Sequence, residues 1–124
     1  LMYTSGTTGN PKGVVRSHRV NAMLAFMTQV ELAIRRPDDA MLVMPLCHAN
    51  SVNFLVSFAY AGAATSVYSS KSFDPAHCLR ALGGMGATFT SLVPTHYILM
   101  LALSQAERGG LDLSRMAKLM ISSA

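Results

Sequence analysis

The chain has 124 residues, enough for one small domain with a single core. It is 51% hydrophobic and 13% charged, against about 25% charged in an ordinary soluble domain, so we expect it to be the interior part of something larger. The net charge is +4, but the basic residues form no stripe or block, and this scatter excludes nucleic acid as an expected partner.

The first part of the chain predicts a strand, a loop, a short strand and a helix. Residues 1–3 are apolar or aromatic and are expected to form a strand that feeds the loop, and residues 14–17 alternate too briefly for more than a short strand. Ser17 is expected to cap a helix over 18–35, because its apolar residues recur at helical spacing. The segment from Pro37 to Asp39 should end that helix.

The rest of the chain alternates between strand and helix patterns. Strands are predicted over 40–45, 64–68, 87–93 and 119–122, and helices over 51–61, 75–82 and 94–107. Asp74 should cap the helix at 75–82, and glycines at 83, 84 and 86 should end it. This alternation predicts an α/β fold, with a largely parallel sheet and helices on both faces.

The loop that follows the first strand has the chemistry of a phosphate-binding loop. It contains four hydroxyl side chains, three glycines and one lysine: Thr4, Ser5, Gly6, Thr7, Thr8, Gly9, Lys12 and Gly13. Hydroxyls and backbone N–H groups can donate to phosphate oxygens, and the lysine supplies a point charge. It is not a Walker A loop, since Pro11 stands where the second glycine belongs and Gly13 follows the lysine. The bland alternative is a surface turn rich in glycine and threonine.

The whole stretch from Tyr3 to Val14 resembles one family signature. Tyr-Thr-Ser-Gly-Thr-Thr-Gly-x-Pro-Lys-Gly-Val is similar to the phosphate-loop signature of the acyl-adenylate-forming (AMP-binding) superfamily, which comprises acyl-CoA synthetases, firefly-type luciferases and peptide-synthetase adenylation domains. Residues 14–19 fit the Val-Val-x-Ser-His-Arg motif of the synthetases better than the corresponding stretch of peptide-synthetase domains, and the chain as a whole resembles a fatty-acid-type acyl-CoA synthetase. The resemblance implies that residues 1–124 are part of the N-terminal adenylation domain and that the small C-terminal domain is absent.

Two further segments resemble motifs of that superfamily. Residues 45–51 are similar to Pro-Leu-Phe-His-x-x-Gly, whose histidine lines the acyl pocket, although a lone histidine such as His48 is more often structural. Cys47 and Ser51 replace the usual aromatic residue and glycine, and both changes can reshape that pocket. Residues 121–124 look like the start of the Ser-Gly-Gly-Ala-Pro motif, so the resemblance implies substrate contacts from Ser122, Ser123 and Ala124.

The resemblance implies an enzyme that activates a carboxylic acid, fatty by expectation, with ATP. It implies that acyl-AMP forms first and that CoA then displaces AMP, with Mg²⁺ held mainly by residues outside this segment. Lys12 and the rest of the phosphate loop would hold the β- and γ-phosphates. The segment lacks the family's catalytic lysine, so we expect it to be inactive alone. The alternatives are a non-catalytic nucleotide- or acyl-binding remnant and an adenylate-forming enzyme for aryl or amino acids.

The cysteines and the hydropathy indicate a reducing compartment, with no membrane-spanning segment. Cys47 and Cys78 lack paired spacing, so we expect free thiols, no metal site and a cytoplasmic location, with peripheral membrane association of the parent protein left open. Residues 40–70 contain no charged side chain, a length that could span a bilayer. Because the pattern changes there from strand to helix and back, we interpret it as a buried core.

Overall fold

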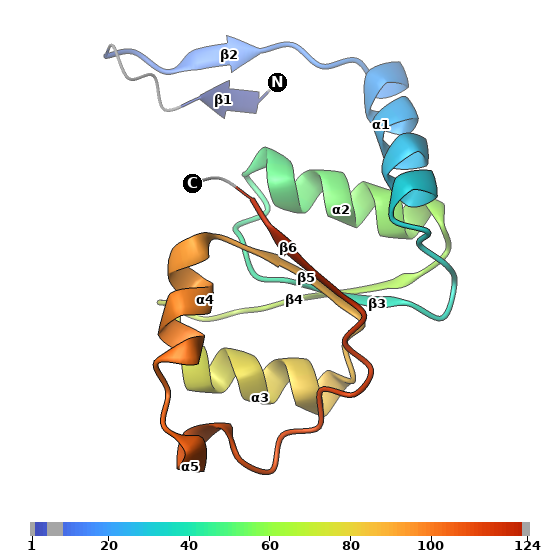
Figure 1. Ribbon diagram of the computed structural model, residues 1–124. Helices are drawn as coiled ribbons and strands as arrows, with labels where there is room; N and C mark the ends of the chain where they lie inside the picture. Colours follow the sequence, from blue (N-terminus) through green and yellow to red (C-terminus); the bar gives the residue numbers. More distant parts are fainter. Residues whose placement is uncertain (1, 5–8, 123–124) are drawn as a thin grey trace.

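The computed structural model describes residues 2–4 and 9–122 of the chain. The elements in chain order are β1 (Met2–Thr4), β2 (Lys12–Val14), α1 (His18–Glu31), β3 (Asp39–Leu42), α2 (Ala49–Tyr60), β4 (Ala64–Val67), α3 (Pro75–Met85), β5 (Phe89–Leu92), α4 (Pro94–Leu101), α5 (Gln105–Arg108) and β6 (Lys118–Ile121). Strands β3 to β6 form one parallel sheet, and β1 and β2 form a separate antiparallel hairpin (Figure 1). The predicted α/β class with a largely parallel sheet is confirmed.

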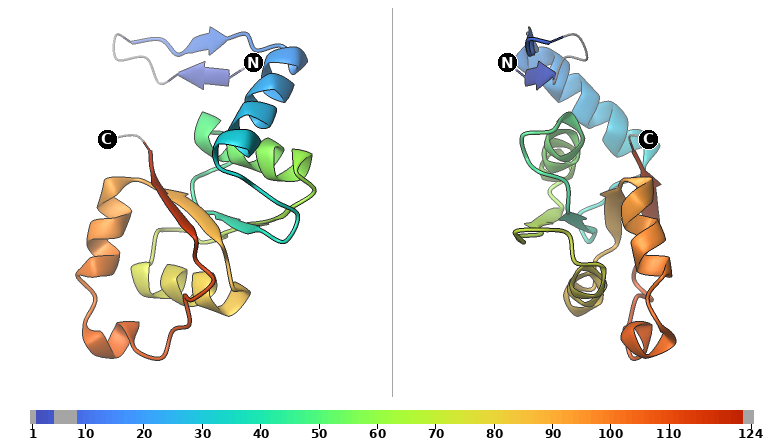
Figure 2. Two further views of the ribbon diagram at one scale, coloured as in Figure 1. Left: turned by 45° about the vertical axis from the view of Figure 1, so that its right-hand side comes forward. Right: turned by 90° about the vertical axis from the view of Figure 1, so that its left-hand side faces the viewer.

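The strand order β4-β3-β5-β6 places the point where the sheet reverses its winding between β3 and β5. Helix α2 lies on one face of the sheet and α3 on the opposite face (Figures 1 and 2). Right-handed crossovers produce this arrangement, because β3 to β4 and β4 to β5 run in opposite directions along the sheet. In such sheets ligands bind outside the carboxyl ends of the strands at the reversal point. A site is therefore expected at the carboxyl ends of β3 and β5.

The sheet separates two hydrophobic clusters. On the α2 face, Phe89 of β5 packs against Phe54 and Phe58, with ring centroids 4.7 and 5.1 Å apart. On the other face, Leu92 belongs to a cluster with residues of α3 and α4, including Met100. The alternation of side chains along each strand explains the division, so one parallel strand contributes to both clusters.

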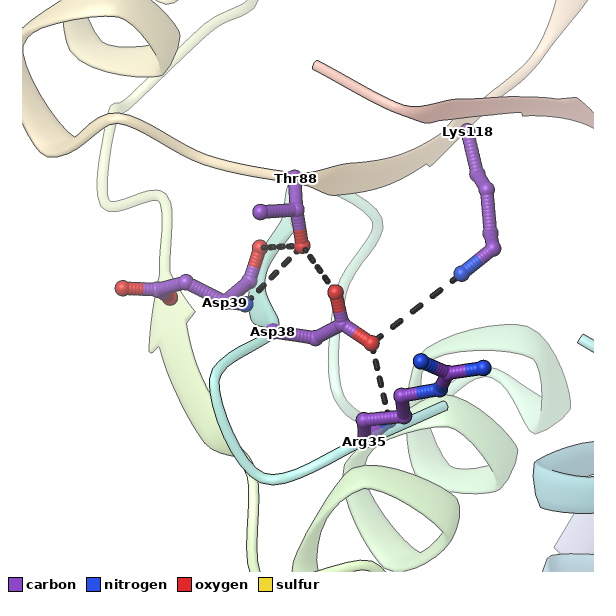
Figure 3. A network of polar contacts seen from close by, with 5 residues as sticks. All are labelled: Arg35, Asp38, Asp39, Thr88 and Lys118. Atoms are coloured by element: carbon purple, nitrogen blue, oxygen red, sulfur yellow. Dashed lines mark hydrogen bonds and ion pairs between the residues drawn. The ribbon is translucent and has the colours of Figure 1, made fainter. Parts of the chain in front are cut away.

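A polar network holds the amino ends of the strands together (Figure 3). The backbone N–H of Asp39 donates to Thr88 Oγ1 at 3.0 Å, and that hydroxyl lies 3.2 Å from Asp38 Oδ1. The other oxygen of Asp38 accepts from the backbone N–H of Arg35 at 2.8 Å and lies 4.0 Å from Lys118 Nζ. The Asp38 carboxylate therefore links the chain before β3 to the starts of β5 and β6, at the edge opposite the expected site.

Helix α1 begins as predicted but ends earlier. Ser17 caps it, and its hydroxyl accepts from the Val20 N–H at 3.2 Å. The predicted end near residue 35 is wrong, since the helix stops at Glu31 and Ala33 adopts a φ of 47°. That turn directs Ile34 into the core, where it is 3% exposed. Helix α1 packs against α2, and several of its apolar side chains remain exposed: Val20, Met23, Leu24, Phe26, Met27 and Val30.

The short strand expected over 14–17 lies instead at Lys12–Val14, and two predicted helices also have different bounds in the structure. Gly83 and Gly84 lie inside α3, and Gly86 alone, in the left-handed conformation, ends it. The helix predicted over 94–107 is two helices, because Ser104 starts a new one. Its hydroxyl accepts from the Glu107 N–H, and the Glu107 carboxylate accepts from the Ser104 N–H, which forms a capping box.

The uncharged stretch 40–70 forms β3, α2 and β4. The prediction of a buried α/β core there is confirmed, since six of its residues reach 2% exposure or less: Ala40, Met41, Leu42, Ser51, Ser57 and Phe58. Within residues 2–4 and 9–122, no helix combines the length and apolar character needed to cross a membrane.

Candidate functional site

The candidate site begins where β3 leaves the sheet. Residues 45–48 form a turn, and His48 is the N-cap residue of α2 without a side-chain cap bond. Ser51 is 1% exposed, and its hydroxyl donates to the Met44 carbonyl at 2.6 Å. Ser51 thus fastens the turn to the helix from inside, whereas the sequence favoured a part for it in shaping the pocket. Cys47 and His48 lie in this turn, and both side chains are exposed.

The hairpin and this turn enclose a cleft of about 620 Å³, which we call the hairpin cleft. It is lined by Met2, Tyr3, Arg16, Asn21, Leu46, Cys47, His48 and Val52. Arg16 is half-buried there, and one of its guanidinium nitrogens donates to the Met2 sulfur at 3.3 Å. The cleft therefore combines apolar walls with a cation and an imidazole, a composition suited to an amphipathic anion.

The predicted phosphate-loop residues belong to this hairpin. Lys12 lies in β2, exposed and in register with Thr4 of β1. Gly9 has a φ of 121°, a conformation that requires glycine. Ser5, Gly6, Thr7 and Thr8 lie outside the described residues. Lys12 is not among the residues that line the hairpin cleft.

A second cleft, of about 560 Å³, lies at the carboxyl ends of β3 and β4. We call it the strand-end cleft, and its walls include His48, Tyr68, Lys71, Phe73 and His96. The ring of His96 stacks on Phe73 with centroids 3.8 Å apart and planes 12° apart. Burial lowers the pKa of His96, because it disfavours the charged imidazolium.

His48 is the predicted site residue that both clefts share. His96 also lines the strand-end cleft, a position that the sequence analysis did not assign to it. The available signal was its place two residues after Pro94, at the start of a helix that follows a buried strand. The same reversal-point argument that places His48 also places His96.

A triangle of hydrogen bonds connects three elements beside these clefts. The amide nitrogen Nδ2 of Asn50 donates to Ser122 Oγ at 2.7 Å and to Ser91 Oγ at 3.0 Å. The two hydroxyl oxygens lie 3.1 Å apart. Ser122, a predicted substrate-binding residue, is thus held against the first turn of α2. Ser123 and Ala124 lie outside the described residues.

In the described part of the chain, no group of three or more His, Cys, Asp or Glu side chains is arranged to hold a metal ion. The donors near the clefts are instead hydroxyls, imidazoles, one guanidinium, the Lys71 ammonium and backbone groups. Their chemistry suits anions, which are bound by N–H and O–H donors.

Comparison with known proteins gives a consistent family assignment. A model of the family described as "AMP-binding enzyme" matches residues 1–124. The chain is 36% identical over 100 residues to a long-chain-fatty-acid–CoA ligase of Thermus thermophilus, covering 79% of this chain and 18% of that protein. It is also 36% identical over 109 residues to a 4-chlorobenzoate–CoA ligase of an Arthrobacter species, covering 85% of this chain and 20% of that protein.

The fold resembles an o-succinylbenzoate CoA synthetase of Bacillus subtilis. The structure in complex with its acyl-adenylate intermediate superposes with a TM-score of 0.79 at 26% identity, covering 99% of this chain and 30% of that chain. A structure of the same enzyme with ATP and magnesium ion gives a TM-score of 0.74 at 27% identity, covering 84% of this chain and 22% of that chain. The chain spans about a fifth of the length of the curated relatives it matches.

Proposed function

The chain belongs to the AMP-binding enzyme family, and we propose that it is the phosphate-binding and acyl-binding part of an ATP-dependent acid–thiol ligase. The reaction would join a carboxylic acid to AMP and then transfer the acyl group to CoA. A fatty acid is the proposed substrate, in keeping with the long-chain ligase among the relatives. The aryl acids named for other relatives define the alternative substrate class.

One observation supports this proposal above the others. Met2 and Tyr3, which lead into the phosphate loop, line the same cleft as the turn that contains His48. An acid bound near His48 and a nucleotide bound by the loop would therefore meet in one space. Proximity of this kind is the main requirement for the first step, because a carboxylate is already a nucleophile near neutral pH.

The roles proposed for the residues follow from charge. As the carboxylate attacks the α-phosphorus, the bond to the leaving pyrophosphate breaks and negative charge grows on the β- and γ-phosphates. Residues 4–9 and Lys12 would hold these phosphates with hydroxyl and N–H donors and one ammonium. His48, Ser122, Ser123 and Ala124 would line the acyl side. Magnesium, bound with ATP mainly by residues beyond this segment, would neutralise phosphate charge.

The test is carboxylate-dependent exchange of labelled pyrophosphate into ATP by the protein that contains this chain. Octanoate, palmitate and benzoate would be supplied in turn, and we expect exchange with at least one of them. No exchange with any acid would remove the ligase proposal. Retained ATP binding without exchange would instead favour the non-catalytic binding module.

Lys12→Ala should slow this exchange by roughly 10²-fold, as expected for loss of one preorganised charge-stabilising donor. Lys118→Ala is the matched control, since Lys118 lies at the opposite edge of the sheet near Asp38 (Figure 3). It should exchange at close to the wild-type rate. An unchanged rate for Lys12→Ala would refute the role assigned to Lys12.

A further inference from the structure

We propose that Asn50 is a positioning residue that sets the geometry between the His48 turn and the segment that begins at Ser122. This inference rests on the proposed function, in which these two segments form the acyl side of the site. Asn50 itself lines neither cleft. It would act through its hydrogen bonds and without touching the substrate.

The geometry of the carboxamide is the first support. Its two N–H bonds diverge from one nitrogen, and each is directed at a different serine hydroxyl, Ser91 and Ser122, 3.0 and 2.7 Å away. The short contact between the two hydroxyls closes the triangle at 3.1 Å. Three polar groups thus satisfy one another at the boundary between core and site.

The triangle also joins parts of the chain that are otherwise separate. Asn50 is in the first turn of α2, Ser91 is in β5, and Ser122 directly follows β6. Figure 1 shows the start of α2 near the carboxyl end of β6. The backbone N–H of Ser122 donates to the Leu92 carbonyl at 3.1 Å, which extends the pairing of β5 with β6. The sheet therefore holds the Ser122 backbone, and Asn50 holds its side chain toward α2.

The burial of Ser91 explains why the hydrogen bonds between α2 and the two serines require asparagine at position 50. Ser91 is 3% exposed, so its hydroxyl needs a partner within the protein. Alanine at position 50 would remove both donors and leave the serines only each other. A shorter serine would not reach both oxygens, and a glutamine would place its amide one carbon further into the triangle. The structure thus favours asparagine for reach and for its two donors.

We expect the hydrogen bonds of Asn50 to affect the binding of the acid and not the binding of the ATP phosphates. Asn50 is two residues beyond His48, so a shift of the first turn of α2 moves both walls of the proposed acyl side. The phosphate-loop residue Lys12 lies in β2, and the described residues of the hairpin receive no side-chain hydrogen bond from Asn50. Loss of the link should therefore weaken the use of the acid selectively.

The experiment measures pyrophosphate exchange by the full protein, with whichever of octanoate, palmitate and benzoate the wild type activates fastest. For Asn50→Ala we expect the KM for the acid to rise about tenfold, the effect of losing two ordinary hydrogen bonds. The KM for ATP should change less than about twofold. A variant that only loosened the fold would lower the amount of active protein and leave both KM values unchanged.

Asn53→Ala is the matched control. Asn53 is one turn further along α2, is half-buried, and its amide also donates to a hydroxyl, Thr28 Oγ1 at 3.3 Å on α1. It reports the loss of an asparagine from this helix at a position that donates to Thr28 and not to the serines of the triangle. We expect its KM for the acid to stay within about twofold of the wild-type value.

Ser91→Ala provides a second, gentler test. It removes a buried oxygen of the triangle that cannot reach substrate, and it should raise the KM for the acid about threefold. Since both substitutions break one linkage, the double variant Asn50→Ala/Ser91→Ala should resemble Asn50→Ala alone.

Three results would overturn the proposal. They are an unchanged KM for the acid in Asn50→Ala, an equal rise in Asn53→Ala, and multiplicative effects in the double variant. Exchange by the wild type together with any of these outcomes removes the positioning role alone. Absence of exchange in the wild type removes the proposed function with it.

Discussion

The end of helix α3 offers a test in which the same substitution has opposite effects two residues apart. Gly86 ends the helix with a φ of 61°, and its N–H donates to the Gly83 carbonyl at 3.0 Å. Gly84 lies within the helix, exposed, with nothing within 4 Å of the place where a Cβ would stand. Alanine at each position therefore separates the effect of the backbone conformation on stability from the effect of replacing a glycine by alanine.

The magnitudes follow from these two environments. Alanine in the left-handed conformation costs roughly 1–2 kcal/mol, and at Gly86 its Cβ would also lie 2.9 Å from the flexible end of Arg115. At Gly84, alanine should stabilise the helix by about 0.5 kcal/mol, a value reduced from the interior because the position is in the last turn. The two variants should thus differ by about 2 kcal/mol in unfolding free energy, which corresponds to roughly 6–10 °C in Tm for a chain of this size.

The assay is thermal unfolding of wild type, Gly84→Ala and Gly86→Ala, followed by circular dichroism at 222 nm. Gly86→Asn is an additional control, because asparagine tolerates the left-handed region better than alanine does. It should melt between Gly86→Ala and the wild type. A Gly86→Ala variant that melts at or above Gly84→Ala would refute the reasoning from φ.

Two further predictions concern titratable groups near α3. Burial, and secondarily the charge of Asp74, raises the pKa of the Cys78 thiol to about 12, while Cys47 is exposed. Ellman's reagent at pH 8 should therefore label one thiol per native chain and two in denaturant. Cys47→Ser should abolish the reaction of the native chain. The His77 backbone N–H, which donates to the Asp74 carboxylate at 3.0 Å, lowers the pKa of Asp74. Because the folded-state pKa lies below the unfolded value of about 4, this cap stabilises the protein above that pH and is lost as pH falls through the lowered pKa. The difference in urea midpoint between wild type and Asp74→Ala should accordingly be constant from pH 5 to 7 and shrink progressively as pH falls below about 4, and a difference that stays the same size throughout the acid range would contradict it.

Local patterns predicted most of the fold because the forces involved are local. The apolar run at 40–45 overlaps β3, and the β-branched and aromatic run at 87–93 contains β5. The caps at Ser17 and Asp74 have the predicted hydrogen bonds. Each of these features depends on a few neighbouring residues, so sequence is sufficient.

The misplaced boundaries have physical reasons of two kinds. The end of α1 depends on the burial of Ile34, which pulls the chain into a turn at Ala33. A tertiary contact of this kind has no local signal. The break before α5 did have one, since Ser104 and Glu107 form a capping box with the usual spacing.

The candidate site was predictable in position but not in detail. Strand alternation places His48 after a buried strand, near the expected crevice. The partners of Asn50, in contrast, are 41 and 72 residues away, and a pattern cannot specify which strands become neighbours. The stack of His96 on Phe73 depends in the same way on the packing of two distant helix starts.

The order of the strands in the sheet also determines when each contact can form during synthesis. Strand β3 obtains its β5 neighbour only when Phe89, the partner of Ala40, has left the ribosome. Asn50 waits longer, because Ser122 is 72 residues further along. At about 5–20 residues per second this interval is roughly 4–14 s. During that time the carboxyl end of the nascent sheet is open, so a nascent chain that has not yet exposed Ser122 lacks one of these walls.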